Sequence, residues 1–362
     1  MMDSTNRRSR RVFAPAAVLA LVMVGCGGDG VPTTTSATTA NADFNGDGKV
    51  LIGVAINGPR DDGAYYQALV EKVEQIAAAN NLEAPIIVDR IDPANAGDEL
   101  RNIAEQGVDI LAVGSSALSE PLPALLEEFP DIFWYCNCGS DYEETPGLLI
   151  TRDRGAELWI SGGYAAGLLM QEKGVDTAVF LGCCDLDFEK ESFAGFQYGL
   201  ALVDVSFRAT YVPTGAFPFD FNNTVSATEA LNNALAEGAD VVVPFLGGAH
   251  DPVVRLANDN DLIVMSGGSS KACERTDLDY DFMVKYDTGD YVEPIFADIF
   301  AGIAVEGTSR DFHVGIGTVV GAEFCAGATD EQVAMLDALN ARIGAGDFTD
   351  VIDAIVAAAY GS

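Results

Sequence analysis

Short apolar runs alternate with amphipathic segments from residue 49 onward, and this alternation constrains the fold more than any other feature of the sequence. Four early runs are VLIGVAI (50–56), PIIV (85–88), VDILAV (108–113) and IFWYC (132–136). They are continuous and rich in β-branched residues, which is typical of strands buried on both faces of a parallel sheet. Between the first two, residues 63–79 have the spacing of a helix. The sequence therefore predicts βαβ units and a doubly wound α/β fold.

The same pattern restarts after Arg154, with TAVFLGC (177–183), FRATYV (207–212), ADVVVPF (239–245) and LIVM (262–265). Because 362 residues are too many for one core of ordinary size, we expect two lobes of similar build. A tail follows the second lobe. It contains DFMVKYD (281–287), a helical segment (291–305) and the strand-like HVGIGTVVG (313–321).

The first helix is expected to begin at the paired acids Asp61 and Asp62. Asp62 occupies the position of an N-cap, whose carboxylate accepts hydrogen bonds from first-turn amides, and Asp61 adds negative charge near the positive end of the helix dipole. Apolar side chains of one helical face follow at Tyr66, Leu69, Val70, Val73 and Ala77.

The N-terminus has the pattern of an export signal. Four arginines precede an apolar run at 12–24, which ends at Gly25 and Cys26. We interpret VMVGC (22–26) as a lipobox, so that residues 1–26 are a lipoprotein signal peptide and Cys26 is the lipid anchor; an ordinary signal-peptidase site is the alternative. SRRVF (9–13) resembles a twin-arginine signal or is simply a basic n-region. This pattern predicts a lipid-anchored protein on the extracytoplasmic face of the cell membrane.

Residues 27–48 are rich in Gly, Ser, Thr and Ala and predict a flexible tether. Within it, Asp43, Asn45, Asp47 and Gly48 match the first half of a calcium loop, but Val54 stands where the loop needs Glu. We therefore predict no metal site and no cofactor. The formal charge of −35 argues against nucleic acid and against an anionic membrane surface as partners.

The loops after the strands are the expected ligand-binding positions. In open α/β sheets, ligands bind outside the carboxyl ends of the strands, and in a two-lobed protein these ends can face each other across a cleft. The segments at these positions are 57–62, 114–116, Asn137, 246–251 and 266–269.

Five segments in order resemble the basic membrane protein family, also called the purine nucleoside receptor family, of substrate-binding lipoproteins for ABC transporters. The segments are DDGAYYQ (61–67), RGAELWISGGYAAGLL (154–169), FAGFQYGL (193–200), FLGGAHDPVV (245–254) and FMVKYDTG (282–289). The resemblance implies a type I periplasmic-binding-protein fold, with two doubly wound parallel-sheet lobes and a ligand cleft between them. We expect lobe 1 to span 49–151 plus 284–320 and lobe 2 to span 152–283 plus 321–362.

The resemblance also implies a nucleoside-type ligand whose base lies between two aromatic rings. Tyr65 stands where one stacking ring is expected, although a core aromatic is the alternative, and Phe217 stands where the other is expected, with Phe219 and Phe221 as competitors. Lys285 stands at the position of a ligand-facing lysine; its alternative role is an ion pair between the lobes. The predicted ligand-binding residues are Asn57, Tyr65, Tyr66, Ser115, Asn137, Phe217, Gly247, Gly268 and Lys285.

The polar side of this predicted site departs from the family pattern. Asn57 follows the first strand where a carboxylate is usual, Asn137 or Cys138 follows the fourth, and SGGSS (266–270) contains no acid. Amides still bond a hydroxyl, but they do so without the charge assistance that a carboxylate gives to ribose.

Six cysteines remain besides Cys26: Cys136, Cys138, Cys183, Cys184, Cys273 and Cys325. An even number in an exported protein indicates disulfides. We expect one bridge to join Cys183 or Cys184 to Cys273 or Cys325. A thiolate metal site is disfavoured because neither Cys-x-Cys nor Cys-Cys has zinc spacing.

The sequence contains no nucleophile elbow, phosphate loop or dinucleotide fingerprint, so we predict no enzyme. We expect a monomeric solute-binding protein that presents a small polar, nucleoside-like solute to an ABC permease. The alternatives are a surface ligand sensor of the same fold that feeds a signalling receptor, and a cysteine-dependent redox or metal protein.

Overall fold

The computed structural model describes residues 39–139, 142–217, 219–285, 287–315, 319 and 321–361. All of them belong to one compact unit, residues 35–362. The predicted signal peptide, Cys26 and the first part of the predicted tether lie outside the described residues. Within the described residues, no helix has the length and apolar character needed to span a membrane.

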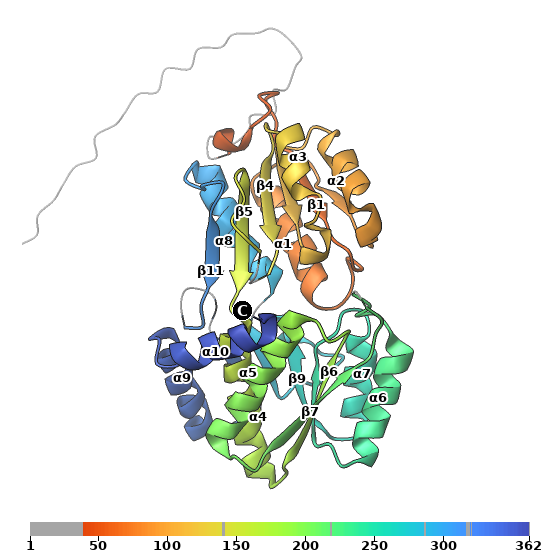
Figure 1. Cartoon of the computed structure of the whole chain (residues 1–362), viewed down its shortest axis with the longest axis vertical. Coiled ribbons are helices and arrows are strands. Elements are labelled where there is room, and N and C mark those ends of the chain that lie inside the picture. Colours follow the sequence, from red (N-terminus) through yellow and green to blue (C-terminus); the bar gives the residue numbers. More distant parts are fainter. Residues whose placement is uncertain are drawn as a thin grey trace, which may run out of the picture. The chain divides into compact units, whose positions relative to one another are not determined.

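The first sheet has the strand order β11–β5–β4–β3–β1–β2 among the described residues, and all neighbouring strands are parallel. The strands are β1 (Ile52–Ala55), β2 (Ile86–Val88), β3 (Ile110–Val113), β4 (Phe133–Asn137), β5 (Leu148–Asp153) and β11 (Ser309–Phe312). Figure 1 shows the blue β11 beside the yellow β5, so a late segment of the chain completes an early sheet.

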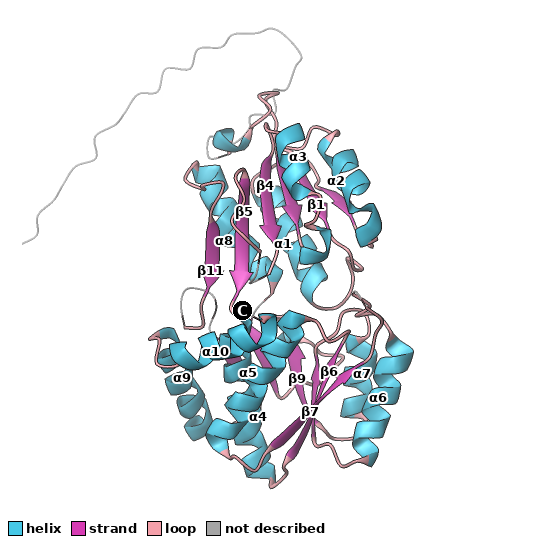
Figure 2. Cartoon of the chain, in the orientation of Figure 1, coloured by secondary structure: helices cyan, strands magenta, loops and turns pink. Residues whose placement is uncertain are grey.

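Helices cover both faces of the first sheet (Figure 2). One face holds α1 (Tyr65–Ala79) and α8 (Thr288–Ala301); the other holds α2 (Ala96–Ala104) and α3 (Leu122–Glu128). Short 3-10 turns occur at Ala40–Ala42, Pro93–Asn95 and Ser116–Leu118. Two buried clusters, one on each face, make this lobe a doubly wound unit.

The second sheet has the order β12–β10–β9–β8–β6–β7 among the described residues. The strands are β6 (Thr177–Gly182), β7 (Arg208–Pro213), β8 (Val241–Pro244), β9 (Ile263–Gly267), β10 (Phe282–Lys285) and β12 (Gly321–Phe324). Among the described strands of this sheet, only the edge strand β12 pairs antiparallel, with β10 as its neighbour.

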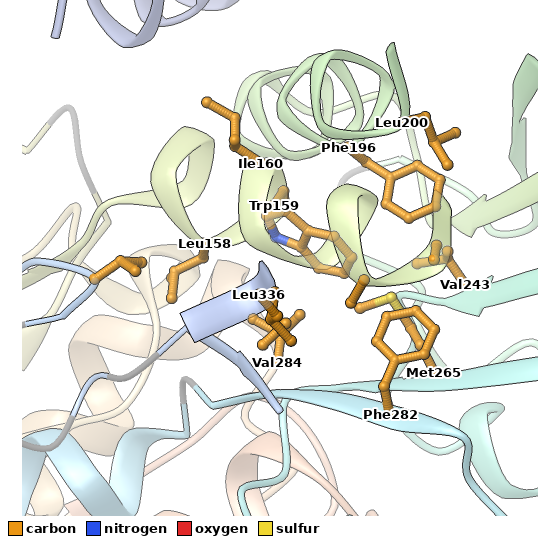
Figure 3. Close-up of a cluster of buried hydrophobic side chains, with 14 of the residues drawn as sticks. Leu158, Trp159, Ile160, Phe196, Leu200, Val243, Met265, Phe282, Val284 and Leu336 are labelled. Atoms are coloured by element: carbon orange, nitrogen blue, oxygen red, sulfur yellow. The ribbon is translucent and has the colours of Figure 1, made fainter. Parts of the chain in front are cut away.

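Helices again cover both faces of the second sheet. One face holds α4 (Gly155–Lys173), α5 (Asp187–Val203), α9 (Asp330–Gly344) and α10 (Thr349–Tyr360); the other holds α6 (Thr224–Ala236) and α7 (His250–Asn258), and a 3-10 turn lies at Ala272–Glu274. Figure 3 shows the core around Trp159 of α4, with Phe196 from α5, Met265 from β9 and Phe282 from β10. The predicted fold class is confirmed.

Close backbone packing holds α4 against α5. A Cβ built on Gly163 would lie 2.0 Å from the carbonyl oxygen of Phe196, and one built on Gly199 would lie 2.2 Å from that of Ile160. Glycine is therefore required where the two helices touch, because any side chain would push them apart.

The strand predicted at residues 313–321 is wrong for the described residues 313–315, which form no strand. Pairing strands lie on both sides instead. β11 ends at Phe312 in the first sheet, and β12 begins at Gly321 in the second. The described residues 313–315 therefore follow a strand of the first sheet and precede a strand of the second, and they belong to neither.

The predicted start of the first helix is correct in its chemistry but displaced in position. Asp62 Oδ1 accepts hydrogen bonds from the amides of Ala64 and Gln67, each at 3.0 Å, and Oδ2 accepts from Tyr66 N at 3.2 Å. However, α1 begins at Tyr65, and the N-cap position belongs to Ala64. Asp61 is exposed and lies 3.5 Å from Arg90.

Candidate functional site

A cavity lies at the carboxyl ends of the strands of both sheets. The first lobe contributes side chains from the start of α1, the loop after β3 and the ends of β4 and β5, namely Asp62, Tyr65, Tyr66, Ser115, Ser116, Asn137 and Asp153. The second lobe contributes Trp159 from α4, part of α5 and the loops after β7, β8 and β9. The cavity volume is about 140 Å³.

Two tyrosines at the start of α1 form an edge-to-face pair on the first wall. Their ring centroids are 5.5 Å apart, with an interplanar angle of 82°. The Tyr65 hydroxyl accepts a hydrogen bond from Asn137 Nδ2 at 2.6 Å. The Tyr66 hydroxyl donates to Asn57 Oδ1, and burial raises the pKa of Tyr66 above its usual value. Residues at two strand ends therefore fix both rings.

Five aromatic side chains line the second wall: Trp159, Phe188, Phe219, Phe221 and Phe245. Trp159 and Phe245 meet edge to face, with centroids 5.3 Å apart at 87°. Phe188 and Phe221 are stacked at 6.3 Å and 25°. These ring–ring contacts stabilise the positions of the side chains, so the wall presents an aromatic surface to the cavity.

Two further acidic side chains, Asp153 at the end of β5 and Glu191 on α5, also line the cavity. Glu191 is only 2% exposed; its Oε1 accepts a hydrogen bond from Ala156 N at 2.7 Å, and its Oε2 accepts one from the Tyr360 hydroxyl at 3.1 Å. Burial, with a further contribution from the charge of Asp153, raises the pKa of Glu191 to about 7. Burial also raises the pKa of Asp153.

Six of the nine predicted ligand-binding residues line this cavity: Tyr65, Tyr66, Ser115, Asn137, Gly247 and Gly268. Gly268 has φ +103°, which L side chains rarely adopt, so a side chain at this position would strain the backbone. Asn57 is not among the residues that line the cavity, and its Oδ1 accepts a hydrogen bond from the Tyr66 hydroxyl.

The structure places Phe217 and Lys285 elsewhere. Phe217 is 79% exposed, whereas Phe219 and Phe221, its competitors in the same segment, line the cavity. Lys285 lies beside a separate polar cavity, where its Nζ is 2.5 Å from Glu323 Oε2. This ion pair joins β10 to β12 within one sheet.

Sequence reasoning missed Trp159, Phe188, Phe245, Asp153 and Glu191. Residues 148–153 (LLITRD) form β5, but the polar end of this run kept it out of the strands predicted from the sequence. Had this strand been predicted, Asp153 would have been expected at a strand end. Phe245 directly follows β8, so the rule that ligands bind after strand ends could have identified it. Trp159 and Glu191 lie on helices, and nothing in the local pattern separates them from core or surface residues.

The expected bridge between Cys183 or Cys184 and Cys273 or Cys325 is wrong. The structure has disulfides Cys136–Cys138, Cys183–Cys184 and Cys273–Cys325. Cys183 follows β6, whereas Cys325 follows β12, four strand spacings away in the sheet order. That separation is about 19 Å, far beyond the reach of a disulfide.

The partial calcium loop is a hydrogen-bonded turn in the structure. Asp43 Oδ2, Asn45 Oδ1 and Asp47 Oδ1 accept from the backbone amides of Gly48, Asp47 and Lys49, respectively, at 2.9–3.0 Å. These oxygens are therefore occupied in shaping the chain as it enters β1.

A family model described as "ABC transporter substrate-binding protein PnrA-like" matches residues 49–267, which is more than half of the chain. The match begins just before β1 and ends with β9. No curated protein matches the sequence.

Solved structures share the fold. A solute-binding protein of an ABC transporter system from Conexibacter woesei is 22% identical, with a TM-score of 0.63, over 82% of this chain and 97% of that one. A solute-binding protein of the same transporter class from Aeropyrum pernix is 14% identical, with a TM-score of 0.65, over 86% and 92%. A transcriptional activator of the comK gene from Bacillus halodurans is 16% identical, with a TM-score of 0.65, over 82% and 98%. At these identities the likeness concerns the fold alone.

Proposed function

Because the chain belongs to the PnrA-like family of ABC transporter substrate-binding proteins, we propose that it captures a nucleoside-like solute in the cavity between its lobes and delivers it to an ABC permease. Membership confirms the resemblance drawn from the sequence, and the family consists of solute-binding proteins rather than enzymes. Such proteins act outside the cytoplasm, which agrees with the export signal predicted at residues 1–26.

One observation carries the nucleoside preference: aromatic rings line both walls of the cavity. Tyr65 lies on the first wall, and Phe219 and Phe221 lie on the second. A planar base that enters between the walls gains π contact on each face, and stacking needs only a π surface rather than one particular ring. Ser115, Asn137 and the acidic residues supply hydrogen-bonding groups for the sugar.

Delivery to a permease is possible because both lobes contribute to the ligand cavity. Each lobe makes only part of the ligand contacts, so bound solute favours the arrangement in which both walls touch it. The permease then distinguishes the loaded from the empty protein by the relative position of the lobes.

A thermal-shift screen of nucleosides, free bases, sugars and amino acids tests the proposal. A ligand at 100 times its dissociation constant stabilises the folded state by about 2.7 kcal/mol. We expect at least one nucleoside to raise the melting temperature more than any sugar or amino acid does. A shift with another class and with no nucleoside would reject the nucleoside preference and leave the family assignment intact.

We also propose that Cys26 carries the lipid that anchors the exported protein. A Cys26→Ser variant expressed in the native host should appear in the soluble extracytoplasmic fraction, whereas the unmodified chain stays with the membrane fraction. Equal partition of the two forms would reject the anchor.

A further inference from the structure

A second cavity adjoins the ligand cavity described above. We call the first one the inner cavity and the second one, with a volume of about 550 Å³, the outer cavity. Ser116, Phe188 and Phe219 line both of them. Because the same three side chains face both spaces, a solute that fills the inner cavity meets the outer cavity at these residues.

Both lobes form this boundary. Ser116 lies in the 3-10 turn after β3 of the first lobe, whereas Phe188 on α5 and Phe219 after β7 belong to the second. The outer cavity reaches the protein surface, since Glu143 and Asp187 in its lining are exposed. The binding site is therefore open on this side to a solute longer than a simple nucleoside.

The sugar is the part of a nucleoside-like solute that faces the outer cavity. In the proposed binding mode the base lies between the aromatic walls, and Ser115 and Asn137 bond the sugar. Ser115 directly precedes the boundary residue Ser116. The 5′ carbon is the exocyclic carbon of ribose, so a substituent at this carbon lengthens the solute without changing the base or the sugar ring.

Two hydroxyl groups of the outer cavity are arranged as acceptors. Ser119 Oγ donates to the carbonyl oxygen of Ser116 at 2.8 Å, and Thr145 Oγ1 donates to the carbonyl oxygen of Glu143 at 3.1 Å. A hydroxyl whose hydrogen is used in this way offers its oxygen lone pairs to a solute. A substituent that satisfies these oxygens must bring hydrogen-bond donors.

The charge of the outer cavity disfavours a phosphate group. Its lining includes the carboxylates of Glu143 and Asp187, and within the described part of the chain it includes no basic side chain. Lys190 pairs with Asp187 at 2.9 Å, but such an exposed pair is weak and offsets only one of the two charges. A phosphate brings acceptors and negative charge to a lining that already supplies both, and the formal charge of −35 adds to the repulsion.

Resting on the proposed function, we infer that the solute is a nucleoside with a donor-bearing, uncharged or cationic substituent at its 5′ position, which occupies the outer cavity while the nucleoside occupies the inner one. The ligand class is thus a 5′-extended nucleoside rather than a nucleotide.

Four probes test this inference by calorimetry on the full chain at pH 7.5. They are adenosine, 5′-S-ethyl-5′-thioadenosine, 5′-S-(2-hydroxyethyl)-5′-thioadenosine and adenosine 5′-phosphate. We expect the hydroxyethyl compound to bind at least threefold more tightly than adenosine and than the ethyl compound, since it alone brings an added donor on its extension. Adenosine 5′-phosphate should bind at least tenfold more weakly than adenosine.

Two variants of the outer cavity locate the effect. Thr145→Trp fills the outer cavity and should remove the advantage of the hydroxyethyl compound, but it should leave the affinity for adenosine unchanged because Thr145 does not line the inner cavity. Glu143→Gln should reduce the penalty on the phosphate at least twofold. Glu229→Gln removes the same charge from an exposed position on α6 and should not change that penalty. Melting curves without ligand show whether each variant folds, and either outer-cavity variant suffices if the other does not.

The outcomes separate this inference from the proposed function. Adenosine binding with no gain from the hydroxyethyl extension, or a gain that persists in Thr145→Trp, would overturn the inference and leave the proposed function intact. Equal affinity of the ethyl and hydroxyethyl compounds would overturn the requirement for a donor, and tight binding of the phosphate would overturn the ligand class. Absence of binding by all four probes would reject the nucleoside preference together with the inference.

Discussion

Asn137 Nδ2 donates a hydrogen bond to the hydroxyl of Tyr65 at 2.6 Å, and this bond joins the end of β4 to the first turn of α1. The two residues are 72 positions apart in sequence. The bond directs the Tyr65 ring along the first wall of the cavity, and Asn137 Oδ1 has no hydrogen-bond partner among the described residues.

Tyr65→Ala should weaken binding of the best nucleoside-like solute without unfolding the protein. Loss of one stacking ring costs about 1–3 kcal/mol, which is about 5- to 150-fold in Kd. Tyr65→Phe keeps the ring and should retain most of the affinity. Calorimetry of the three proteins measures the effect. If Tyr65→Ala lowers ligand-free stability by more than about 3 kcal/mol, Tyr65 is a core residue instead.

Glu191 should make stability fall as pH rises. Its folded pKa, about 7, lies above the usual 4.5, so the folded protein holds this proton more tightly than the unfolded chain does. The contribution is complete below pH about 4.5 and is lost as pH rises through about 7, with a total of up to about 3 kcal/mol. The groups facing Glu191 are Asp153, Arg154, the Ala156 amide and the Tyr360 hydroxyl.

Urea unfolding across pH 4.5–8 of the natural chain and of Glu191→Gln provides the measurement. The difference in stability between the two proteins should change over this interval, because other titrating groups are common to both. A difference that stays constant with pH would show that Glu191 has an ordinary pKa.

Asp62→Ala should destabilise the first lobe by about 1–3 kcal/mol, because three backbone amides lose a buried acceptor. Asp61→Ala is the matched control: its side chain is 79% exposed, and we expect a change within about 0.5 kcal/mol. Chemical denaturation compares the two. Equal effects would mean that charge near the helix end matters more than the specific hydrogen bonds.

Gly163→Ala should cost about 3 kcal/mol, because the new methyl group would meet the Phe196 carbonyl oxygen and force α4 and α5 apart. Gly97→Ala on α2 meets nothing closer than Pro121 Cβ at 3.5 Å and should stabilise by about 0.5–1 kcal/mol. Opposite signs in thermal unfolding support the packing argument, and a neutral Gly163→Ala would contradict it.

The Cys273–Cys325 bridge should contribute more stability than the Cys136–Cys138 bridge. The first closes a separation of 52 residues and the second a separation of 2. Loop-closure entropy gives about 4 kcal/mol for the former and under about 2 kcal/mol for the latter. Replacing each pair by alanines and measuring unfolding in urea tests the order, and the reverse order would mean that local packing outweighs chain entropy.

Much of the fold could be predicted because its signal is local. The strand at 50–56 and the helix after it appear as β1 and α1, and Leu69, Val70, Val73 and Ala77 are buried as their spacing predicts. Residues 313–315 were mistaken for part of a strand because an apolar run has the same composition whether or not it pairs within a sheet.

The cavity lining was predicted at several strand ends and missed on the helices, and Asp153 and Phe245, which lie at strand ends, were missed as well. Tyr65, Ser115 and Asn137 lie beside strand ends that periodicity reveals, and all three line the cavity. Phe217 was chosen over Phe219 and Phe221 because the sequence does not show which of three nearby rings turns inward.

The sequence by itself determined the two α/β lobes and the edge at which a ligand would bind, since hydrophobic periodicity and parallel-strand topology depend on neighbouring residues. Only the tertiary structure decided the disulfide pairing and the meeting of Asp153, Glu191 and the aromatic wall. Those relationships join β5, α4 and α5 with the loops after β7 and β8. They depend on how separate elements pack in space, which no local pattern specifies.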